Sequence, residues 1–240
     1  MPPEPRDRRR HLRVGHVLLM STSKYRYISI EGNIGAGKTT LVERLARDLE
    51  YRMVLETFSD NPFLPLFYSD PDRHAFTVEL FFLMERHRQL RRELAQGNLF
   101  EGGVISDYFF RKTLLFARNN LSALEFRLFQ QIFERLHEAF PQPDLLVYLH
   151  RPVDQLLEQI RGRGRTFEQD IPPEYLLRLQ RTYLDYFQLE ESVPILLLDL
   201  GDSDFLAEWS LYTGIQRILT QPHEPGMRWI TLQDLRKTGQ

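Results

Sequence analysis

The chain has 240 residues, of which 42% are hydrophobic, and this length and composition suffice for one α/β domain with a sizeable core. The formal net charge of −2 gives no global electrostatic argument for a nucleic-acid or membrane partner, and no apolar run approaches the ~20 residues of a membrane span. The absence of cysteine excludes disulfides and thiol nucleophiles within this chain and fits a cytoplasmic location.

Residues 1–24 are predicted to form a disordered N-terminal arm. Residues 1–13 hold five arginines and three prolines without the periodicity of a helix or a strand. The apolar stretch over 14–20 is too short and too interrupted for a signal peptide, and Met20 is an alternative start of translation.

The first functional motif is G-x-x-x-x-G-K-[ST] at residues 32–39, named here the phosphate loop. A strand predicted over 25–30 precedes it and a helix predicted over 40–49 follows it, a context that argues against a mere glycine-rich turn. The glycines let backbone N–H groups surround a phosphate, Lys38 adds charge, and the Thr39 hydroxyl is placed for Mg²⁺. We expect ATP to bind Gly32, Asn33, Ile34, Gly35, Ala36, Gly37, Lys38, Thr39 and Thr40.

The rest of the chain alternates between strand and helix patterns. Strands are predicted over 52–56, 103–107, 144–149 and 194–199. Helices are predicted over 61–68, 71–94, 121–140, 152–161, 173–190 and 202–219, and a further helical segment after the third strand extends to residue 116. This order predicts a P-loop kinase fold of the α/β class over residues 25–220, with a five-stranded parallel sheet covered by helices on both faces. Residues 221–240 are predicted to be an irregular tail.

An arginine lid, residues 161–165, is predicted after the fourth strand. Arg161, Arg163 and Arg165 alternate with glycines, as expected of a mobile flap that neutralises charge on a transferring phosphoryl group. The alternative is a solvated basic loop, which the glycines and the nearby Glu168 disfavour. Arg161 is therefore expected to contribute to ATP binding.

Two isolated acids, Glu56 and Asp107, end the second and third predicted strands, where ligands of a parallel sheet gather. One can accept the proton of an attacking hydroxyl while the other holds Mg²⁺ beside Thr39. From spacing alone, a loop carboxylate or helix cap is an equally good interpretation of each.

From residue 27 to about 205 the chain resembles the deoxynucleoside kinases, and most closely the bacterial deoxyguanosine/deoxyadenosine kinase branch. The combination of the phosphate loop, the lid and the Glu168-Gln169 pair is far more specific than the loop alone. The segments that carry the resemblance are 31–40, Glu56, 60–64, 67–68, 72–76, Glu79, Arg86, 106–108, 116–117, 163–165, 168–169 and 173–176.

The resemblance implies transfer of the ATP γ-phosphate to the 5′-hydroxyl of a purine deoxynucleoside, with Mg²⁺, by a homodimer. By position it implies that Glu56 is the general base and that Arg163, Arg165 and Lys38 contact the donor phosphates. On the nucleoside, Tyr68 and Glu168 would bind the sugar 3′-hydroxyl, Glu79 and Arg86 would line the base pocket, and Phe116 would stack on the base. Asp107 would lie near the substrate and the metal ion. The aromatic residues would be ordinary core residues in most folds.

Three positions depart from the family pattern. Tyr108 stands where many relatives have an arginine, Gln159 stands where an arginine precedes the lid, and Glu79 stands where glutamine is frequent. An ionised glutamate only accepts hydrogen bonds, so it suits the N1–H and 2-amino group of guanine, whereas adenine would need a protonated glutamate.

Two other functions remain open on sequence. A thymidylate kinase shares the start of the phosphate loop, but would need a site for a substrate phosphate. An inactive kinase-like structural or regulatory subunit would not need the intact Lys38, Thr39, Glu56 and lid arginines.

Overall fold

The computed structural model describes residues 24–56, 61–95, 103–137 and 140–240. Almost the whole predicted N-terminal arm lies outside these ranges, and so does Asp60 of the segment 60–64. Among the described residues, no helix is long and apolar enough to cross a membrane.

The core of the structure is a parallel sheet with the strand order β2-β3-β1-β4-β5-β6. Its central strands are buried over nearly their whole length, which explains their near-continuous apolar sequences. The strands are β1 (Tyr27–Gly32), β2 (Arg52–Val54), β3 (Val104–Ser106), β4 (Leu145–His150), β5 (Pro194–Asp199) and β6 (Gly226–Ile230). The prediction of a parallel sheet is confirmed, but the described sheet has six strands rather than five.

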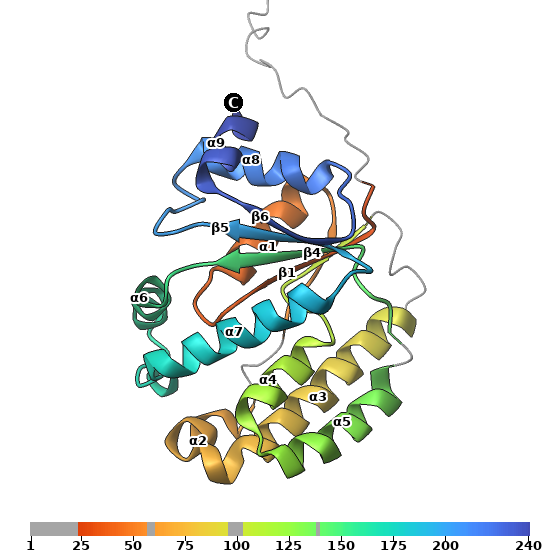
Figure 1. Cartoon of the computed structure of the whole chain (residues 1–240), viewed down its shortest axis with the longest axis vertical. Coiled ribbons are helices and arrows are strands. Elements are labelled where there is room, and N and C mark those ends of the chain that lie inside the picture. The colour runs from red at the N-terminus through yellow and green to blue at the C-terminus, as the bar shows by residue number, and fades with distance from the viewer. Residues whose placement is uncertain (1–23, 57–60, 96–102, 138–139) are drawn as a thin grey trace, which may run out of the picture.

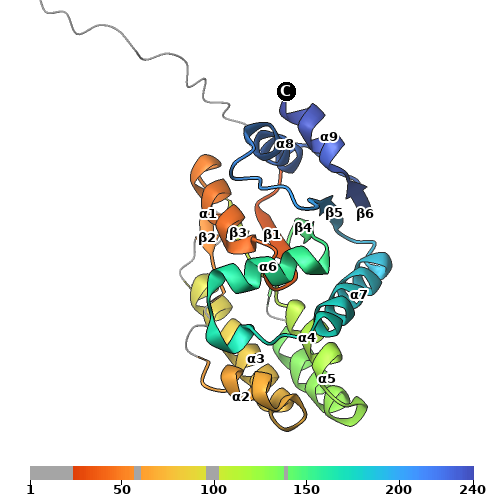
Figure 2. The same ribbon diagram turned by 90° about the vertical axis from the view of Figure 1, so that its left-hand side faces the viewer.

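Helices cover both faces of the sheet, as predicted. They are α1 (Lys38–Asp48), α2 (Leu64–Ser69), α3 (Pro71–Ala95), α4 (Lys112–Asn120), α5 (Ala123–His137), α6 (Val153–Arg163), α7 (Pro173–Leu189), α8 (Trp209–Thr220) and α9 (Leu232–Gly239), with a short 3-10 helix η1 (Thr166–Glu168). Figure 1 shows α1, α8 and α9 on one side of the sheet and α3, α4, α5 and α7 on the other. Figure 2 looks onto the carboxyl ends of the strands, where α6 crosses in front of the sheet.

The C-terminal segment corrects the prediction of an irregular tail over 221–240. β6 pairs in parallel with β5 from Pro194↔Gly226 to Leu198↔Ile230, so it occupies the edge that a five-stranded sheet would leave open. α9 then begins with a capping box, in which the Thr231 hydroxyl accepts from the Asp234 N–H and the Asp234 carboxylate accepts from the Thr231 N–H. The five residues of β6 are too short a pattern to predict a strand from sequence alone, and they form one because they pair with β5.

The predicted helix over 202–219 begins later than expected. The structure places its first residue at Trp209, and a loop over 200–208 connects it to β5. In this loop Phe205 is buried against the phosphate loop, where its ring carbon Cζ lies 3.3 Å from the position that a Cβ on Gly37 would occupy.

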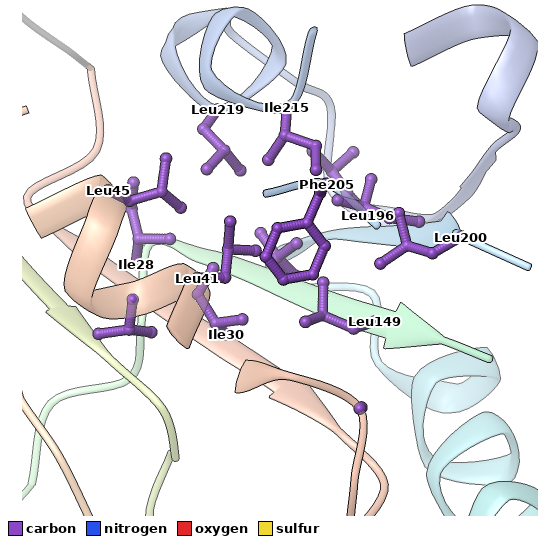
Figure 3. Close-up of a cluster of buried hydrophobic side chains, with 14 of the residues drawn as sticks. Ile28, Ile30, Leu41, Leu45, Leu149, Leu196, Leu200, Phe205, Ile215 and Leu219 are labelled. Carbon is purple, nitrogen blue, oxygen red and sulfur yellow. The ribbon is translucent and has the colours of Figure 1, made fainter. Parts of the chain in front are cut away.

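The largest cluster of buried side chains lies between the sheet and α1 and α8. Figure 3 shows Phe205 among aliphatic side chains from β1, β4, β5, α1 and α8. The labelled members are Ile28, Ile30, Leu41, Leu45, Leu149, Leu196, Leu200, Phe205, Ile215 and Leu219. Because β1 and α1 both belong to this cluster, the phosphate loop that joins them is held between two rigid elements.

A test of the C-terminal packing follows from Gly214, where α8 crosses α9. A Cβ at this position would lie 1.9 Å from the Leu235 carbonyl oxygen, a backbone atom that cannot move without displacing α9. We expect Gly214→Ala to lower the free energy of unfolding by about 1–3 kcal/mol, measured by urea denaturation.

The matched control is Gly162→Ala. A Cβ on Gly162 meets nothing within 4 Å, and this residue lies inside α6, so the substitution should raise stability by ~0.5–1 kcal/mol. Equal midpoints for wild type and Gly214→Ala would show that α9 does not pack on α8 as described.

Candidate active site

One pocket lies at the carboxyl ends of the strands, between the phosphate loop, α2, α3, α4 and the lid. It encloses about 790 Å³, including open space at its mouth, which is within the usual size of a small-molecule site. Of the predicted site residues, the pocket is lined by Ile34, Gly35, Ala36, Gly37, Lys38, Thr39, Glu56, Tyr68, Glu79, Arg86, Asp107, Phe116, Arg163, Arg165 and Glu168. The fold therefore brings together residues that are up to 134 positions apart in the chain (34 to 168).

Four residues predicted to bind ATP do not line this pocket: Gly32, Asn33, Thr40 and Arg161. The Asn33 side chain connects the phosphate loop to α7: its Nδ2 donates to the Leu176 carbonyl at 2.8 Å, and its Oδ1 accepts from the Ile34 N–H. Arg161 is exposed on α6. A part for Arg161 in ATP binding stays a prediction.

The phosphate loop has the backbone of an anion site. Gly35 and Gly37 have φ values of +82° and +91°, a region that residues with a Cβ rarely adopt. The N-terminus of α1 points into the loop, and its first turn contains no acidic residue to offset the positive end of the helix dipole.

Lys38 folds back over the loop and donates from Nζ to the carbonyl oxygens of Gly32 and Asn33, both at 2.9 Å. Burial and the charge of Lys112 lower its pKa to about 8, against the opposing effect of nearby carboxylates. The negative charge of a bound phosphate would favour the ionised ammonium group and raise the pKa of Lys38 again.

Glu56 is held between two buried cations. Arg86 donates to its Oε1 from both Nε, at 2.7 Å, and Nη2, and Lys112 donates from Nζ to its Oε2 at 2.6 Å. Burial by itself would raise the pKa of Glu56, but these two charges and their hydrogen bonds outweigh it and lower the pKa to about 2. Glu56 is therefore ionised at every physiological pH.

Asp107 connects Glu56 to the phosphate loop. Its Oδ1 accepts from the Glu56 N–H at 2.7 Å, and its Oδ2 accepts from the Thr39 hydroxyl, also at 2.7 Å. Burial and the charge of Glu56 raise the pKa of Asp107. Thr39 and Asp107 are thus adjacent oxygen donors of the kind that Mg²⁺ takes when phosphates supply its other ligands.

Glu79 lies deep in the pocket, with 2% of its surface exposed. Its Oε1 accepts from Asn120 Nδ2 at 2.6 Å, while its Oε2 has no hydrogen-bond partner among the described residues. Burial raises the pKa of Glu79 to about 7, although the charge of Arg86 and the bond from Asn120 act in the opposite direction.

The lid arginines contact a buried acid, Glu168. Arg165 Nη1 lies 3.1 Å and Arg163 Nη1 3.6 Å from Glu168, which is buried. Gly164, in the left-handed region at φ +74°, turns the chain between the two arginines and has open space around it. The lid thus has the room and the backbone freedom that an exchange of partners would require.

Sequence reasoning missed three polar residues of the pocket: Lys112, Asn120 and Tyr175. Lys112 had only a weak signal, because it lies between Arg111 and Thr113 within the otherwise aromatic and aliphatic residues of 108–116. At the position of the departure, the Tyr108 hydroxyl donates to Gln89 at 2.9 Å, and Lys112 supplies a positive charge beside Glu56 in addition to that of Arg86.

A parallel sheet with a phosphate loop, a buried carboxylate between two cations and an arginine lid define this protein as a P-loop kinase. Residues 28–219 match the family model described as Deoxynucleoside kinase. The chain belongs to the deoxynucleoside kinase family, and it is accordingly an ATP-dependent enzyme that phosphorylates a deoxynucleoside. β6 and α9 lie beyond the matched residues.

Curated relatives agree with this assignment. The chain is 36% identical over 186 residues to a deoxyguanosine kinase of Bacillus subtilis, covering 75% of this chain and 89% of the relative. It is 30% identical over 193 residues to a deoxyadenosine kinase of Lactobacillus acidophilus, covering 75% and 87%. The solved structure of deoxyadenosine kinase from M. mycoides with bound dATP shares the fold, with a TM-score of 0.63 and 24% identity over 72% of this chain and 90% of that chain.

Proposed function

We propose that this enzyme transfers the γ-phosphoryl group of ATP to the 5′-hydroxyl of a purine deoxynucleoside, as part of nucleotide salvage. The observation that carries the proposal is the pocket itself, which joins the phosphate loop and Glu56 to a buried carboxylate, Glu79, suited to the edge of a base. Kinases of deoxyguanosine or deoxyadenosine predominate among the similar relatives and support a purine, although relatives named deoxyadenosine/deoxycytidine kinase and deoxycytidine kinase are similar to the chain as well.

Positioning and charge stabilisation carry most of the chemistry in this mechanism. Lys38 and the lid arginines, Arg163 and Arg165, neutralise charge on the transferring phosphoryl group. Each lid arginine contacts Glu168 through Nη1, and the several N–H donors of a guanidinium let it bind phosphate oxygens as well, while Glu168 binds the sugar 3′-hydroxyl together with Tyr68. Phe116 stacks on the base, and the ammonium of Lys112 lies 5.5 Å from the centroid of its ring.

Glu56 accepts the hydrogen bond of the 5′-hydroxyl and takes its proton. A carboxylate with a pKa of about 2 is a weak base, so it takes the proton late, once bond formation to phosphorus has made the hydroxyl acidic. Its contribution to the rate is on the order of 10²–10⁴-fold.

The donor set of Thr39 and Asp107 fits Mg²⁺, because both present hard oxygen atoms next to the phosphate loop. When bound there, the ion would neutralise charge on the β- and γ-phosphate oxygens. The homodimer and the cytoplasmic location expected from the sequence stay predictions.

The test is phosphorylation of the four deoxynucleosides and of thymidine monophosphate with Mg-ATP. We expect turnover of deoxyguanosine and deoxyadenosine to exceed that of the pyrimidine deoxynucleosides by at least ~10-fold in kcat/KM, because one bidentate contact to a base discriminates by about 1–3 kcal/mol. Turnover of thymidine monophosphate alone would favour the thymidylate kinase alternative. No turnover of any substrate would favour an inactive structural or regulatory subunit.

A further inference from the structure

Glu79 presents one free oxygen to the pocket. Asn120 holds Oε1, so the rotation of the carboxyl group is restricted, and the buried Oε2 has no partner among the described residues. A buried carboxyl oxygen without a partner is costly unless a ligand supplies one. The oxygen is therefore expected to contact whatever fills this end of the pocket.

The protonation state of Glu79 decides what that contact can be. Each carboxyl oxygen has two lone pairs, so Oε1 can accept a second hydrogen bond beside the one from Asn120. A carboxylate only accepts, and its two oxygens thus match the N1–H and the 2-amino group of guanine. A carboxylic acid donates one hydrogen bond and accepts another, which matches N1 and the 6-amino group of adenine. A glutamine presents both a donor and an acceptor at all pH values, so it cannot change its preference in this way.

We propose that the ionisation of Glu79 selects the purine, with the carboxylate favouring deoxyguanosine and the carboxylic acid favouring deoxyadenosine. This inference rests on the proposed function, because it assumes that a purine base occupies the pocket. It makes base preference a property of the pH at which the enzyme works rather than a constant.

The groups that face Glu79 leave it free to titrate near neutrality. The charged and titratable side chains around it are Arg86 on its own helix, Tyr68 on α2, Lys112 on α4, Tyr175 on α7 and Glu56 after β2. Burial raises the pKa of both tyrosines far above neutrality, and Glu56 stays ionised in its pairing with Arg86 and Lys112. The pKa of Glu79, at about 7, is within the physiological range.

Two buried groups at the phosphate loop also titrate in this range. They are Lys38 of the loop, with a pKa of about 8, and Glu31, the residue before the loop, whose pKa burial raises to about 7. Their ionisation alters transfer to both purines alike, so it cancels in a ratio of the two rates. The ratio of kcat/KM for deoxyadenosine to that for deoxyguanosine is therefore the quantity to measure.

The experiment lets the two purine deoxynucleosides compete in one reaction with Mg-ATP, between about pH 6 and about pH 8. We expect the ratio for the wild type to fall about 10-fold per pH unit, or about 100-fold in total, because it follows the ratio of protonated to ionised Glu79. Glu79→Gln should give a ratio that does not change with pH. Glu85→Gln, which lies on the same helix outside the pocket, should retain the wild-type slope.

The outcomes separate this inference from the proposed function. Turnover of both purines with a ratio independent of pH overturns the inference and leaves the function standing, whereas absence of purine turnover overturns the function itself. If Glu79→Gln does not fold, Glu79→Asp is the second variant, since it keeps a carboxyl group and should keep the slope. An unchanged slope in a folded Glu79→Gln enzyme also overturns the inference.

Discussion

Replacement of Glu56 by glutamine should lower kcat for a purine deoxynucleoside at least ~100-fold, since the amide cannot take the proton of the 5′-hydroxyl. The KM should change much less, because glutamine still hydrogen-bonds to the hydroxyl. The measurement is steady-state kinetics with saturating Mg-ATP. A loss of less than about tenfold would contradict the assignment of Glu56 as base.

The pairing of Glu56 requires a control for folding. Glutamine leaves Arg86 and Lys112, both buried, without their counter-charge, a change that typically costs about 3–5 kcal/mol. The double variant Glu56→Gln/Lys112→Met removes one unpaired cation and should recover part of this stability, but none of the activity. Recovery of activity in the double variant would show that the single variant failed through misfolding rather than chemistry.

The pH dependence of stability provides a separate check on Glu56. Its pKa in the folded state, about 2, lies below the ordinary glutamate value of 4.5, so its ionisation stabilises the fold fully above about pH 4.5. This contribution is lost as the pH falls from about 4.5 to about 2. Glu56→Gln should therefore show a smaller loss of stability than the wild type over this range.

Replacement of Lys38 by methionine should reduce kcat/KM at least ~10²–10³-fold, because the charge that faces the β- and γ-phosphates is lost. The ATP-induced rise in melting temperature should disappear as well. Without nucleotide, the variant should be no less stable than the wild type at neutral pH. Burial lowers the pKa of Lys38 from 10.5 to about 8, so Lys38 destabilises the fold increasingly as the pH falls from 10.5 to about 8 and fully below it, and a neutral side chain avoids that cost.

Lys237→Met is the matched control for Lys38→Met, since it removes a lysine from the exposed surface of α9. It should leave both the kinetics and the response to ATP unchanged. Retention of the ATP-induced shift in Lys38→Met would contradict the placement of the triphosphate on the phosphate loop.

Local sequence was sufficient for much of this protein. The phosphate loop needs a strand before it and a helix after it, and these patterns lie within 25 consecutive residues (25–49). The buried parallel strands could be predicted from their apolar runs, and the long helix α3 (Pro71–Ala95) from its periodicity between Pro71 and Gly97. Such features depend on neighbours along the chain.

The tertiary structure decided the rest, because those features depend on residues that are distant in sequence. β6 forms by pairing with the edge of β5. α9 packs closely on α8 because Gly214 has no side chain where the Leu235 carbonyl oxygen lies. Glu56 meets Arg86 from α3 and Lys112 from α4, which are 30 and 56 positions away in the chain. The sequence by itself thus determined the family, the sheet type and most of the pocket residues. Long-range packing decided which cations pair with Glu56 and how residues 221–240 fold.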